Sequence, residues 1–279
     1  MRAAYYEANG AARKVLRLSE VETPQPGRGE VRVRLAVSGV NPSDVKSRAG
    51  LTRKIAFPRV IPHSDGAGEI DQVGEGVSPS RVGERVWVWN GQWRRPFGTA
   101  AQSIVLPSEQ AVPLPAHIGM DVGACLGIPA YTAKGEIARR AGADHVVDYK
   151  REDVGERIMA LTGKRGVDAA IEVDLAANAR LLPTVLAPNG VVAIYGSGAP
   201  EASIPFQFLL QNSITLKFFL VYLMPREQRA RATADITRML ERGELVHNVA
   251  QSFDLGAIVA AHEAVESGKA MGNIVVRIA

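Results

Sequence analysis

The run Asp168-Ala-Ala-Ile-Glu-Val173 and the run Val191-Val-Ala-Ile-Tyr195 lie on either side of a stretch with helical periodicity. Both runs are short and apolar, which is typical of strands that are buried on both faces. Between them, residues 176–186 place their large apolar side chains on one stripe of a helix. Strands and helices that alternate in this way predict an α/β fold with a doubly wound parallel sheet.

The same alternation of predicted strands and helices continues before and after this stretch. Residues 145–148 are predicted to form another buried strand, and residues 153–161 form an amphipathic helix. The long apolar run 213–223 is rich in β-formers, and Pro225 is suited to the first turn of the helix that follows. A later helix and a final strand at 274–278 complete this part of the chain.

The N-terminal part reads differently. Residues 30–37 alternate, with valines and a leucine on one face and Arg32 and Arg34 on the other, as a half-buried strand requires. Further short strands are expected at 68–73, 85–89 and 102–106, separated by glycine and proline turns. This part is predicted to be a small β-rich domain.

Composition excludes several classes of protein. The 279 residues are 46% apolar and 22% charged, which argues against disorder. No secretory signal or membrane-spanning run is present, so we expect a cytoplasmic protein. The single cysteine, Cys125, excludes an internal disulfide and a cysteine-cluster zinc site. The net charge of +4 comes from scattered arginines, so nucleic-acid binding is not favoured.

Seven blocks, in order and across nearly the whole chain, carry a specific resemblance. They are Ser38-Gly-Val-Asn-Pro-Ser-Asp44, Ile61-Pro-His-Ser-Asp-Gly-Ala-Gly68, Val82-Gly-Glu-Arg-Val86, Phe97-Gly-Thr-Ala-Ala-Gln102, Gly127-Ile-Pro-Ala-Tyr-Thr-Ala133, Ala141-Gly-Ala-Asp-His-Val-Val-Asp-Tyr149 and Ala261-His-Glu-Ala-Val-Glu-Ser-Gly268. Together they resemble the zinc-independent quinone oxidoreductases (zeta-crystallin-like) of the medium-chain dehydrogenase/reductase family. The resemblance implies a GroES-like domain at 1–127, to which residues 247–279 return, and a Rossmann-type nucleotide-binding domain at 128–246.

The resemblance also implies chemistry without a metal. Zinc-dependent relatives carry a cysteine where Asn41 stands and a histidine where Ser64 stands, and an amide with a hydroxyl is a poor zinc ligand set. His63 beside Ser64 is better explained as a structural residue. What remains is hydride transfer from NADPH to a quinone or an α,β-unsaturated carbonyl compound.

Two residues are the catalytic candidates. In the resemblance Asn41 lies by the nicotinamide and substrate, where its amide can donate to a developing oxyanion, although Asn41-Pro42 can also simply form a turn. Asp44 shares that turn, and a structural role for it is as plausible as a chemical one. For the cluster Trp87, Trp89 and Trp93, core packing is favoured over an aromatic shelf for a flat quinone.

The resemblance carries over a set of cofactor-binding residues, which are Asn41, Thr132, Lys134, Tyr149, Val173, Tyr195, Gly196, Ser197, Phe219 and Asn273. Lys134 corresponds to a basic residue that meets the ribose 2′-phosphate, and Tyr149 lies near the same end, so NADPH is favoured over NADH.

One element of the family is missing from the sequence. Dinucleotide-binding domains need a first strand, a glycine turn and the helix that follows, and no G-x-G-x-x-G stands at the junction of Ala133 and Lys134. Loss of the central strand should cost more than the roughly 5 to 15 kcal/mol that stabilises a domain. Either the full polypeptide has residues here that this sequence lacks, which we favour, or a shortened variant has lost cofactor binding.

The second of these explanations supports an alternative function. A noncatalytic family member, structural or in contact with RNA, would not need the phosphate loop. For either function we expect a homodimer in which the run 213–223 extends the sheet across an edge strand.

Overall fold

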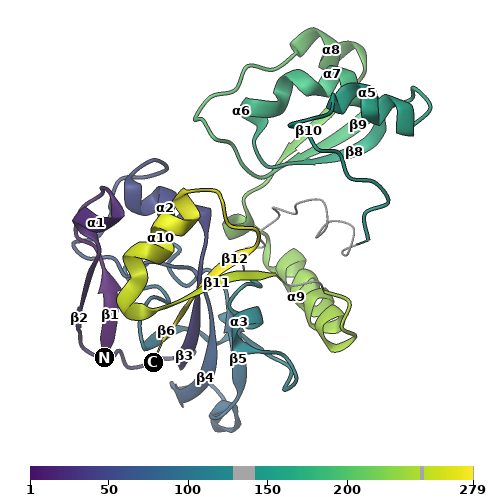
Figure 1. Cartoon of the computed structure of the whole chain (residues 1–279). Coiled ribbons are helices and arrows are strands. Elements are labelled where there is room, and N and C mark those ends of the chain that lie inside the picture. Colours follow the sequence, from purple (N-terminus) through teal and green to yellow (C-terminus); the bar gives the residue numbers. More distant parts are fainter. Residues whose placement is uncertain (128–141, 246–247, 279) are drawn as a thin grey trace. The chain divides into compact units, whose positions relative to one another are not determined.

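The structure is a computed structural model that describes residues 1–127, 142–245 and 248–278. The chain divides into two compact units (Figure 1), of which unit 1 is Met1–Ile137 with Ala230–Ala279 and unit 2 is Ala138–Arg229. Thr132, Lys134 and the junction between Ala133 and Lys134 lie outside the described residues. The expected domain boundaries stay predictions.

Unit 1 is the β-rich unit. Its helices and strands are β1 (Arg2–Tyr5), α1 (Ala12–Val15), β2 (Arg17–Glu20), β3 (Glu30–Val40), α2 (Pro42–Ala49), β4 (Asp65–Val73), β5 (Arg85–Val88), β6 (Ser103–Pro107), β7 (Ala111–Pro113), α3 (Met120–Gly123), most of α9 (Arg226–Glu241), β11 (Val249–Asp254), α10 (Ile258–Glu266) and β12 (Asn273–Arg277). Seven strands form one sheet in the order β11-β12-β3-β4-β5-β7, and β6 also pairs with β3.

The long strand β3 organises unit 1. Its apolar positions Val31, Val33, Leu35 and Val37 are all buried, as their alternation predicts. Because β3 pairs with β4, β6 and β12, the two ends of the chain meet in one sheet, and the C-terminal strand β12 is hydrogen-bonded to the strand that leads into α2.

Unit 2 is a small α/β unit. Its helices and strands are α5 (Val154–Leu161), β8 (Val167–Glu172), α6 (Leu175–Asn178), α7 (Leu182–Val185), β9 (Leu186–Ile194), α8 (Phe206–Gln211) and β10 (Thr215–Phe218). The three strands are parallel, in the order β10-β9-β8. The predicted parallel sheet with flanking helices is therefore confirmed.

Two details of the prediction are wrong. Residues 145–148 are not a strand, and Asp148 instead begins a turn in which its backbone N–H donates to Glu152 Oε1 at 2.8 Å. Strands β8 and β9 are not buried on both faces, because Ile171 is 75% exposed and Val191 is 40% exposed. Among the described residues β8 has a neighbour on one edge only, and no described strand or helix covers these side chains.

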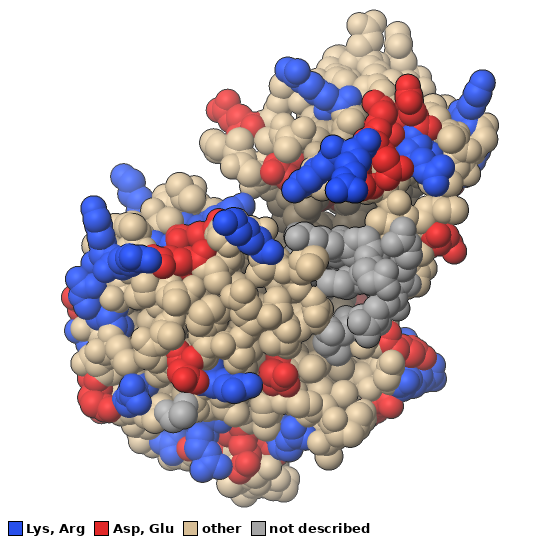
Figure 2. Space-filling view, in the orientation of Figure 1, with Lys and Arg blue, Asp and Glu red and all other residues tan. Residues whose placement is uncertain are grey.

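Charged side chains are mixed over the surface. On the face shown in Figure 2, lysines and arginines alternate with aspartates and glutamates over each unit. On this face such mixing gives no single-sign field of the kind that binds a nucleic-acid backbone. Within the described ranges, no helix has both the length and the apolar content to cross a membrane.

Candidate functional site

Asn41 stands where β3 ends and α2 begins. Its backbone is extended, and Pro42 occupies the first helical position, where its missing N–H is not needed. The Asn41 N–H donates to Asp44 Oδ2 at 2.8 Å, so the carboxyl of Asp44 caps the start of the helix. The structural role that the sequence allows for Asp44 is therefore present, and it fixes the backbone of Asn41.

The side chain of Asn41 is also held. Its Nδ2 atom donates to Asp65 Oδ2 at 2.8 Å, and both side chains are buried. Asp65 is the first residue of β4 and lies opposite Gly39 of β3, so the pairing of these strands places its carboxylate beside Asn41. Because an ionised carboxylate only accepts hydrogen bonds, the nitrogen end of the amide must face Asp65. The amide nitrogen carries two N–H groups, and the contact with Asp65 uses one of them.

A directed chain of hydrogen bonds reaches Asp65 from the opposite side of the sheet. Thr99 Oγ1 donates to the Asp65 carbonyl at 2.6 Å, so its lone pairs accept from Ser38 Oγ at 2.7 Å. Ser38 therefore accepts from His63 Nδ1 at 2.8 Å, which leaves His63 Nε2 to accept from His262 Nε2 at 2.9 Å. The single carbonyl acceptor thus fixes the tautomers of both histidines.

Burial keeps both histidines neutral. Desolvation, and then the charge of the facing ring, lowers the pKa of His63 well below its usual range. Desolvation, with the nearby charge of Arg48, lowers the pKa of His262 to about 3. This arrangement supports the structural interpretation of His63.

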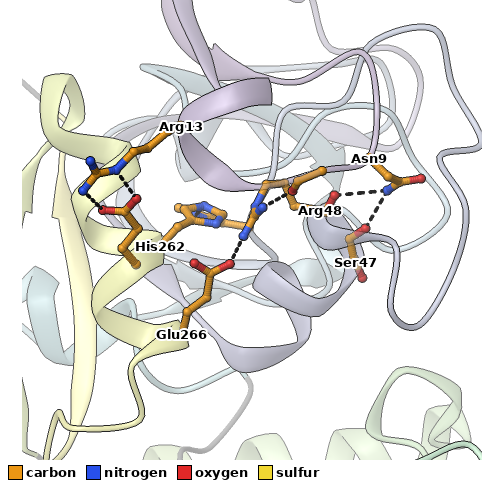
Figure 3. A network of polar contacts seen from close by, with 9 residues as sticks. Asn9, Arg13, Ser47, Arg48, His262 and Glu266 are labelled. Carbon is orange, nitrogen blue, oxygen red and sulfur yellow. Dashed lines mark hydrogen bonds and ion pairs between the residues drawn. The ribbon is translucent and has the colours of Figure 1, made fainter.

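Helix α2 is anchored at its other end by Arg48 (Figure 3). This guanidinium is fully buried, and it donates to the Gly10 carbonyl and to Glu266 Oε1 of α10. Asn9 Nδ2 donates to the carbonyls of Ser47 and Arg48 at 2.9 and 3.2 Å. The C-terminal end of α2, the helix that begins after Asn41, is therefore held in place by these hydrogen bonds.

Asp44 titrates in an unusual range. Desolvation raises its pKa to about 7, against the opposing effects of the Asn41 N–H and the charge of Arg53. Near neutral pH this carboxyl exchanges a proton, but in the structure it caps α2 and contacts Asn41 rather than an open cavity. We therefore regard Asp44 as a residue that positions Asn41.

Asn273 and Cys125 lie near the same end of the sheet. Asn273 is the first residue of β12, next to Ile274, which pairs with Val40 of β3. The Cys125 thiol donates to the Asp121 carbonyl at 3.2 Å, and burial raises the pKa of the thiol to about 12, against the opposing effect of the Asn273 side chain. Cys125 is thus protonated. A Cβ at Gly127 would come within 2.1 Å of Asp65 Oδ1, so only glycine fits beside that carboxylate.

The remaining candidates belong to unit 2. Tyr195, Gly196, Ser197 and Phe219 line a crevice of about 570 Å³. Tyr195 follows the end of β9 and Phe219 follows the end of β10, and their ring centroids are 5.8 Å apart. The carboxyl ends of parallel strands are where open α/β sheets bind ligands.

Val173 and Tyr149 are the two other cofactor candidates of unit 2, and neither has a clear contact with the crevice. Val173 follows β8, and its carbonyl lies so close to Gly196 that a Cβ there would approach to 2.3 Å. Tyr149 is 74% exposed, with only Lys150 Nζ near its ring at 6.0 Å. Neither Val173 nor Tyr149 lines the crevice, although the backbone of Val173 lies against Gly196, which does.

These residues fit one half of a dinucleotide. The crevice is wide enough for a nicotinamide ring and is lined by aromatic and small residues. A diphosphate needs free N–H groups at a helix start. In the described part of unit 2, the starts of α5 and α6 are capped by the carboxylates of Asp153 and Asp174, which would repel an anion.

Metal ligands do not gather in the described part of the chain. No group of three or more histidine, cysteine, aspartate or glutamate side chains there could hold an ion. His63 and His262 contact each other through their Nε2 atoms, and His63 Nδ1 is bonded to Ser38 in the chain that ends at Asp65.

The sequence did not indicate Asp65, Ser38, Thr99 or His262 as parts of the site. All four lie in the seven sequence blocks that carry the family resemblance. Their contacts, however, depend on the pairing of β3 with β4 and on the packing of α10. No local sequence signal marks Asp65, because its contact with Asn41 joins residues 24 positions apart in the chain.

Comparisons with known proteins agree with this architecture. The model of the alcohol dehydrogenase GroES-like domain matches residues 27–116, and that of the zinc-binding dehydrogenase family matches residues 141–276. A quinone oxidoreductase of Pseudomonas aeruginosa is 24% identical over 94% of this chain and 95% of its own length. A 2-haloacrylate reductase of a Burkholderia species is 23% identical over 92% and 93%.

Solved structures share the fold. A quinone oxidoreductase of Pseudomonas syringae has a TM-score of 0.84 and 21% identity, with 99% of both chains covered. A mycobacterial protein complexed with NADPH has a TM-score of 0.83 and 23% identity, with 100% of both chains covered.

Alignments to the relatives run over more positions than this chain has residues. The alignment to the Burkholderia protein runs over 314 positions, so at least 35 of them have no counterpart among the 279 residues here. The family models leave residues 117–140 unmatched, which includes the Ala133–Lys134 junction. Both family models match in order, and the structure has the β-rich unit and the parallel-sheet unit that they describe. The chain therefore belongs to the medium-chain dehydrogenase/reductase family and is a quinone oxidoreductase-like oxidoreductase.

Proposed function

We propose that this protein is a zinc-independent reductase that uses NADPH to transfer a hydride to a quinone or an α,β-unsaturated carbonyl compound. The observation that carries the proposal is the Asn41 amide, which Asp65 holds with a defined orientation at 2.8 Å. A preorganised N–H of this kind stabilises negative charge that develops on an acceptor oxygen. The names of the quinone oxidoreductase and haloacrylate reductase relatives support this reaction class.

Zinc independence rests on the donor set. Asn41 and Ser64 stand where zinc-dependent relatives carry a cysteine and a histidine, and neither amide nor hydroxyl is a good zinc ligand. The Asn41 amide is moreover already engaged with Asp65. Polarisation of the acceptor therefore falls to a hydrogen bond rather than to a Lewis acid.

The cofactor proposal rests on the crevice of unit 2. Tyr195, Gly196, Ser197 and Phe219 would hold the nicotinamide end, and a reduced nicotinamide supplies the hydride when it is bound. Lys134 would meet the 2′-phosphate, as the resemblance implies. Binding of the diphosphate requires a segment that this sequence lacks, and the cofactor is therefore the part of the proposal that most needs a direct test.

A titration of NADPH into the purified protein, followed by nicotinamide fluorescence, tests cofactor binding. Oxidation of NADPH with 1,4-benzoquinone then tests catalysis. We expect saturable binding and turnover, and Asn41→Asp should lower kcat because the donor is replaced by a second carboxylate beside Asp65. Absence of NADPH binding would overturn the proposed function for this polypeptide.

The second candidate is a noncatalytic member of the family that has lost dinucleotide binding. The missing phosphate loop and the open edge of β8 favour it. Its form as an RNA-contacting protein has less support, since the surface charges are mixed (Figure 2). RNA binding that weakens steeply with salt, without NADPH turnover, would identify it.

We also propose a homodimer through β10 and a cytoplasmic location. Strand β10 is an edge of its sheet, and beside it Phe218 is 65% exposed and Leu223 is 57% exposed. Pairing of this edge with a second copy would cover both its open backbone groups and these side chains.

A further inference from the structure

A cavity in unit 1 is lined by none of the residues that we assign to the reaction. It has a volume of about 230 Å³. Ser47 of α2, the loop at residues 53–57, and the side chains of Gln92 and Arg94 contribute to its wall. Pockets for drug-sized ligands commonly measure about 300 to 1,000 Å³. A cavity of this size therefore suits a small molecule or a single ionic group.

The wall of the cavity is positively charged. Arg53, Lys54 and Arg94 line it, and no aspartate or glutamate does. In the part of the chain that the structure describes, none of these three side chains has a carboxylate within ion-pair distance. Arg32 of the same unit, by contrast, pairs with Asp71 at 2.8 Å. The charge of the cavity is therefore left for a ligand to neutralise.

Arg53 is held at the wall by a buried amide. Its Nη2 atom donates to Gln92 Oε1 at 2.7 Å, and Gln92 Nε2 donates in turn to the Arg95 carbonyl at 2.8 Å. The Gln92 side chain is itself buried. A guanidinium that is held in this way loses little rotamer freedom when it binds a ligand.

Arg94 is brought to the same wall by an unusual backbone conformation. Its φ is 57°, in the left-handed region that bulky residues seldom adopt. The guanidinium carbon of Arg94 lies 5.5 Å from the centroid of the Trp93 ring, and that of Arg53 lies 5.4 Å from it. The ring attracts each cation but carries no net charge. Two guanidinium groups thus lie beside one ring, and an anion bound with them would relieve their repulsion.

The other polar groups near the cavity do not oppose an anion. Ser47 contributes a hydroxyl to the wall, and burial raises the pKa of Tyr6, which also lines it, to about 12, so the phenol stays neutral. Asp44 is near enough for the charge of Arg53 to act on its pKa, but it does not line the cavity. Because desolvation raises the pKa of Asp44 to about 7, this carboxyl cancels only part of the charge of Arg53 near neutral pH.

We propose that this cavity binds a phosphate group, either inorganic phosphate or the phosphate of a small monoester. A phosphate monoester carries a charge of about −1.5 to −2 at pH 7 and three strong acceptor oxygens, which matches three cations better than the single charge of a carboxylate does. Ile55, Phe57 and Val60 form an apolar side of the same cavity, which can contact a small organic group. Binding at this site needs neither NADPH nor an acceptor, so the proposal stands apart from the proposed function.

Isothermal titration calorimetry tests the proposal with inorganic phosphate, phenyl phosphate and acetate, at pH 7.5 and constant ionic strength. We expect phosphate to bind roughly tenfold or more tightly than acetate, because it engages more of the cations at once. Tighter binding of phenyl phosphate than of inorganic phosphate would support a monoester that uses the apolar side. Equal binding of the two would support inorganic phosphate as the ligand.

Two variants locate the site. Arg53→Gln should weaken phosphate binding about tenfold, and Arg94→Gln about threefold, since Arg94 is more exposed and its contacts are more strongly screened. Arg28→Gln is the matched control, because it removes an exposed positive charge that faces Glu75 and does not line the cavity. It should leave the affinity for phosphate unchanged, and circular dichroism checks that each variant is folded.

Several results would overturn the proposal. Acetate that binds as tightly as phosphate, or no binding of phosphate at all, would exclude a phosphate site. Wild-type affinity in both Arg53→Gln and Arg94→Gln would place the phosphate elsewhere on the protein. An equal loss of affinity in Arg28→Gln would show attraction by net charge rather than by this cavity. NADPH oxidation with benzoquinone is measured separately, so a failure of the proposed function would be distinguished from a failure of this site.

Discussion

The amide nitrogen of Asn41 lies 2.8 Å from Asp65 Oδ2; Asn41 directly follows β3, and Asp65 begins the neighbouring strand β4. The carboxylate decides which end of the amide faces the protein and which N–H faces outward. Asp65→Asn removes this constraint, because an amide can present either a donor or an acceptor. We expect kcat to fall by roughly 10²-fold, the effect of one misplaced donor.

The measurement is steady-state NADPH oxidation, with circular dichroism to check that the fold is retained. Asp71→Asn is the control, because Asp71 also lies on β4 and forms an ion pair with Arg32 away from Asn41. An Asp65→Asn protein with wild-type kcat would show that the orientation of the amide does not limit the reaction.

Asp44 predicts a pH dependence of stability. Its pKa is raised from 3.8 to about 7 by burial, so the folded state binds a proton that the unfolded state releases. The contribution to the free energy of unfolding is therefore present below pH 4 and is lost as the pH rises toward 7. The slope is about 1.4 kcal/mol per pH unit in that window.

Urea unfolding at pH 4.5, 5.5, 6.5 and 7.5 measures this slope. Asp44→Asn should remove a contribution of about 1.4 kcal/mol per pH unit from the measured slope, since an amide does not titrate and still accepts the Asn41 N–H. Asp235→Asn, which changes an exposed carboxylate on α9, should behave like the wild type. Identical slopes for wild type and Asp44→Asn would contradict the raised pKa.

The pair of histidines predicts the opposite dependence, in a pH range that overlaps that of Asp44. Both have lowered pKa values, so the folded state keeps them neutral while the unfolded state binds protons below about pH 6.5. Their contribution is present above that pH and is lost as the pH falls toward 3. His262→Gln retains a donor for His63 and removes one titrating group, so the acid-side slope should become shallower by about 1.4 kcal/mol per pH unit.

The exposed His145 provides the control, because His145→Gln removes a histidine without touching the buried chain of hydrogen bonds. Its acid unfolding profile should match that of the wild type. If His145→Gln and His262→Gln changed the profile equally, burial of His262 would not be the cause.

Arg48 and Glu266 predict a loss of stability rather than of chemistry. The guanidinium is fully buried, whereas Glu266 is about one-third exposed. Glu266→Gln leaves a buried cation without its counter-charge, which should cost roughly 1 to 3 kcal/mol, less than for a fully buried pair because of solvent screening.

Glu263→Gln on the same helix is the matched comparison. It breaks the pair with Arg13, whose side chain is 77% exposed, and should lower stability far less than Glu266→Gln does because solvent screens this pair. Urea titrations of both variants give the difference, and equal losses would argue against a special role for the buried pair.

The sequence predicted those parts of the fold that depend on local patterns. The alternation in β3 gave the buried face correctly, and the apolar runs of β8 and β9 gave a parallel pair. The strand predicted at residues 145–148 is absent because a strand needs a hydrogen-bonded neighbour, and the described residues offer none at that position. Asp65 and His262 escaped prediction because their contacts join segments distant in sequence.

The two edges of the sheet in unit 2 allow the proposed dimer to be tested. Strand β10 ends in Phe218, and β8 carries Ile171 at the other edge, both strongly exposed. If two copies pair through β10, Phe218→Lys places a charge in the contact and should shift sedimentation from dimer to monomer at micromolar concentration. Ile171→Lys introduces the same charge at the other edge and should leave the dimer intact. If only Ile171→Lys dissociated the dimer, the interface between the two copies would instead lie at β8. In the usual strand order of such sheets, β8 is the edge that pairs with the missing strand.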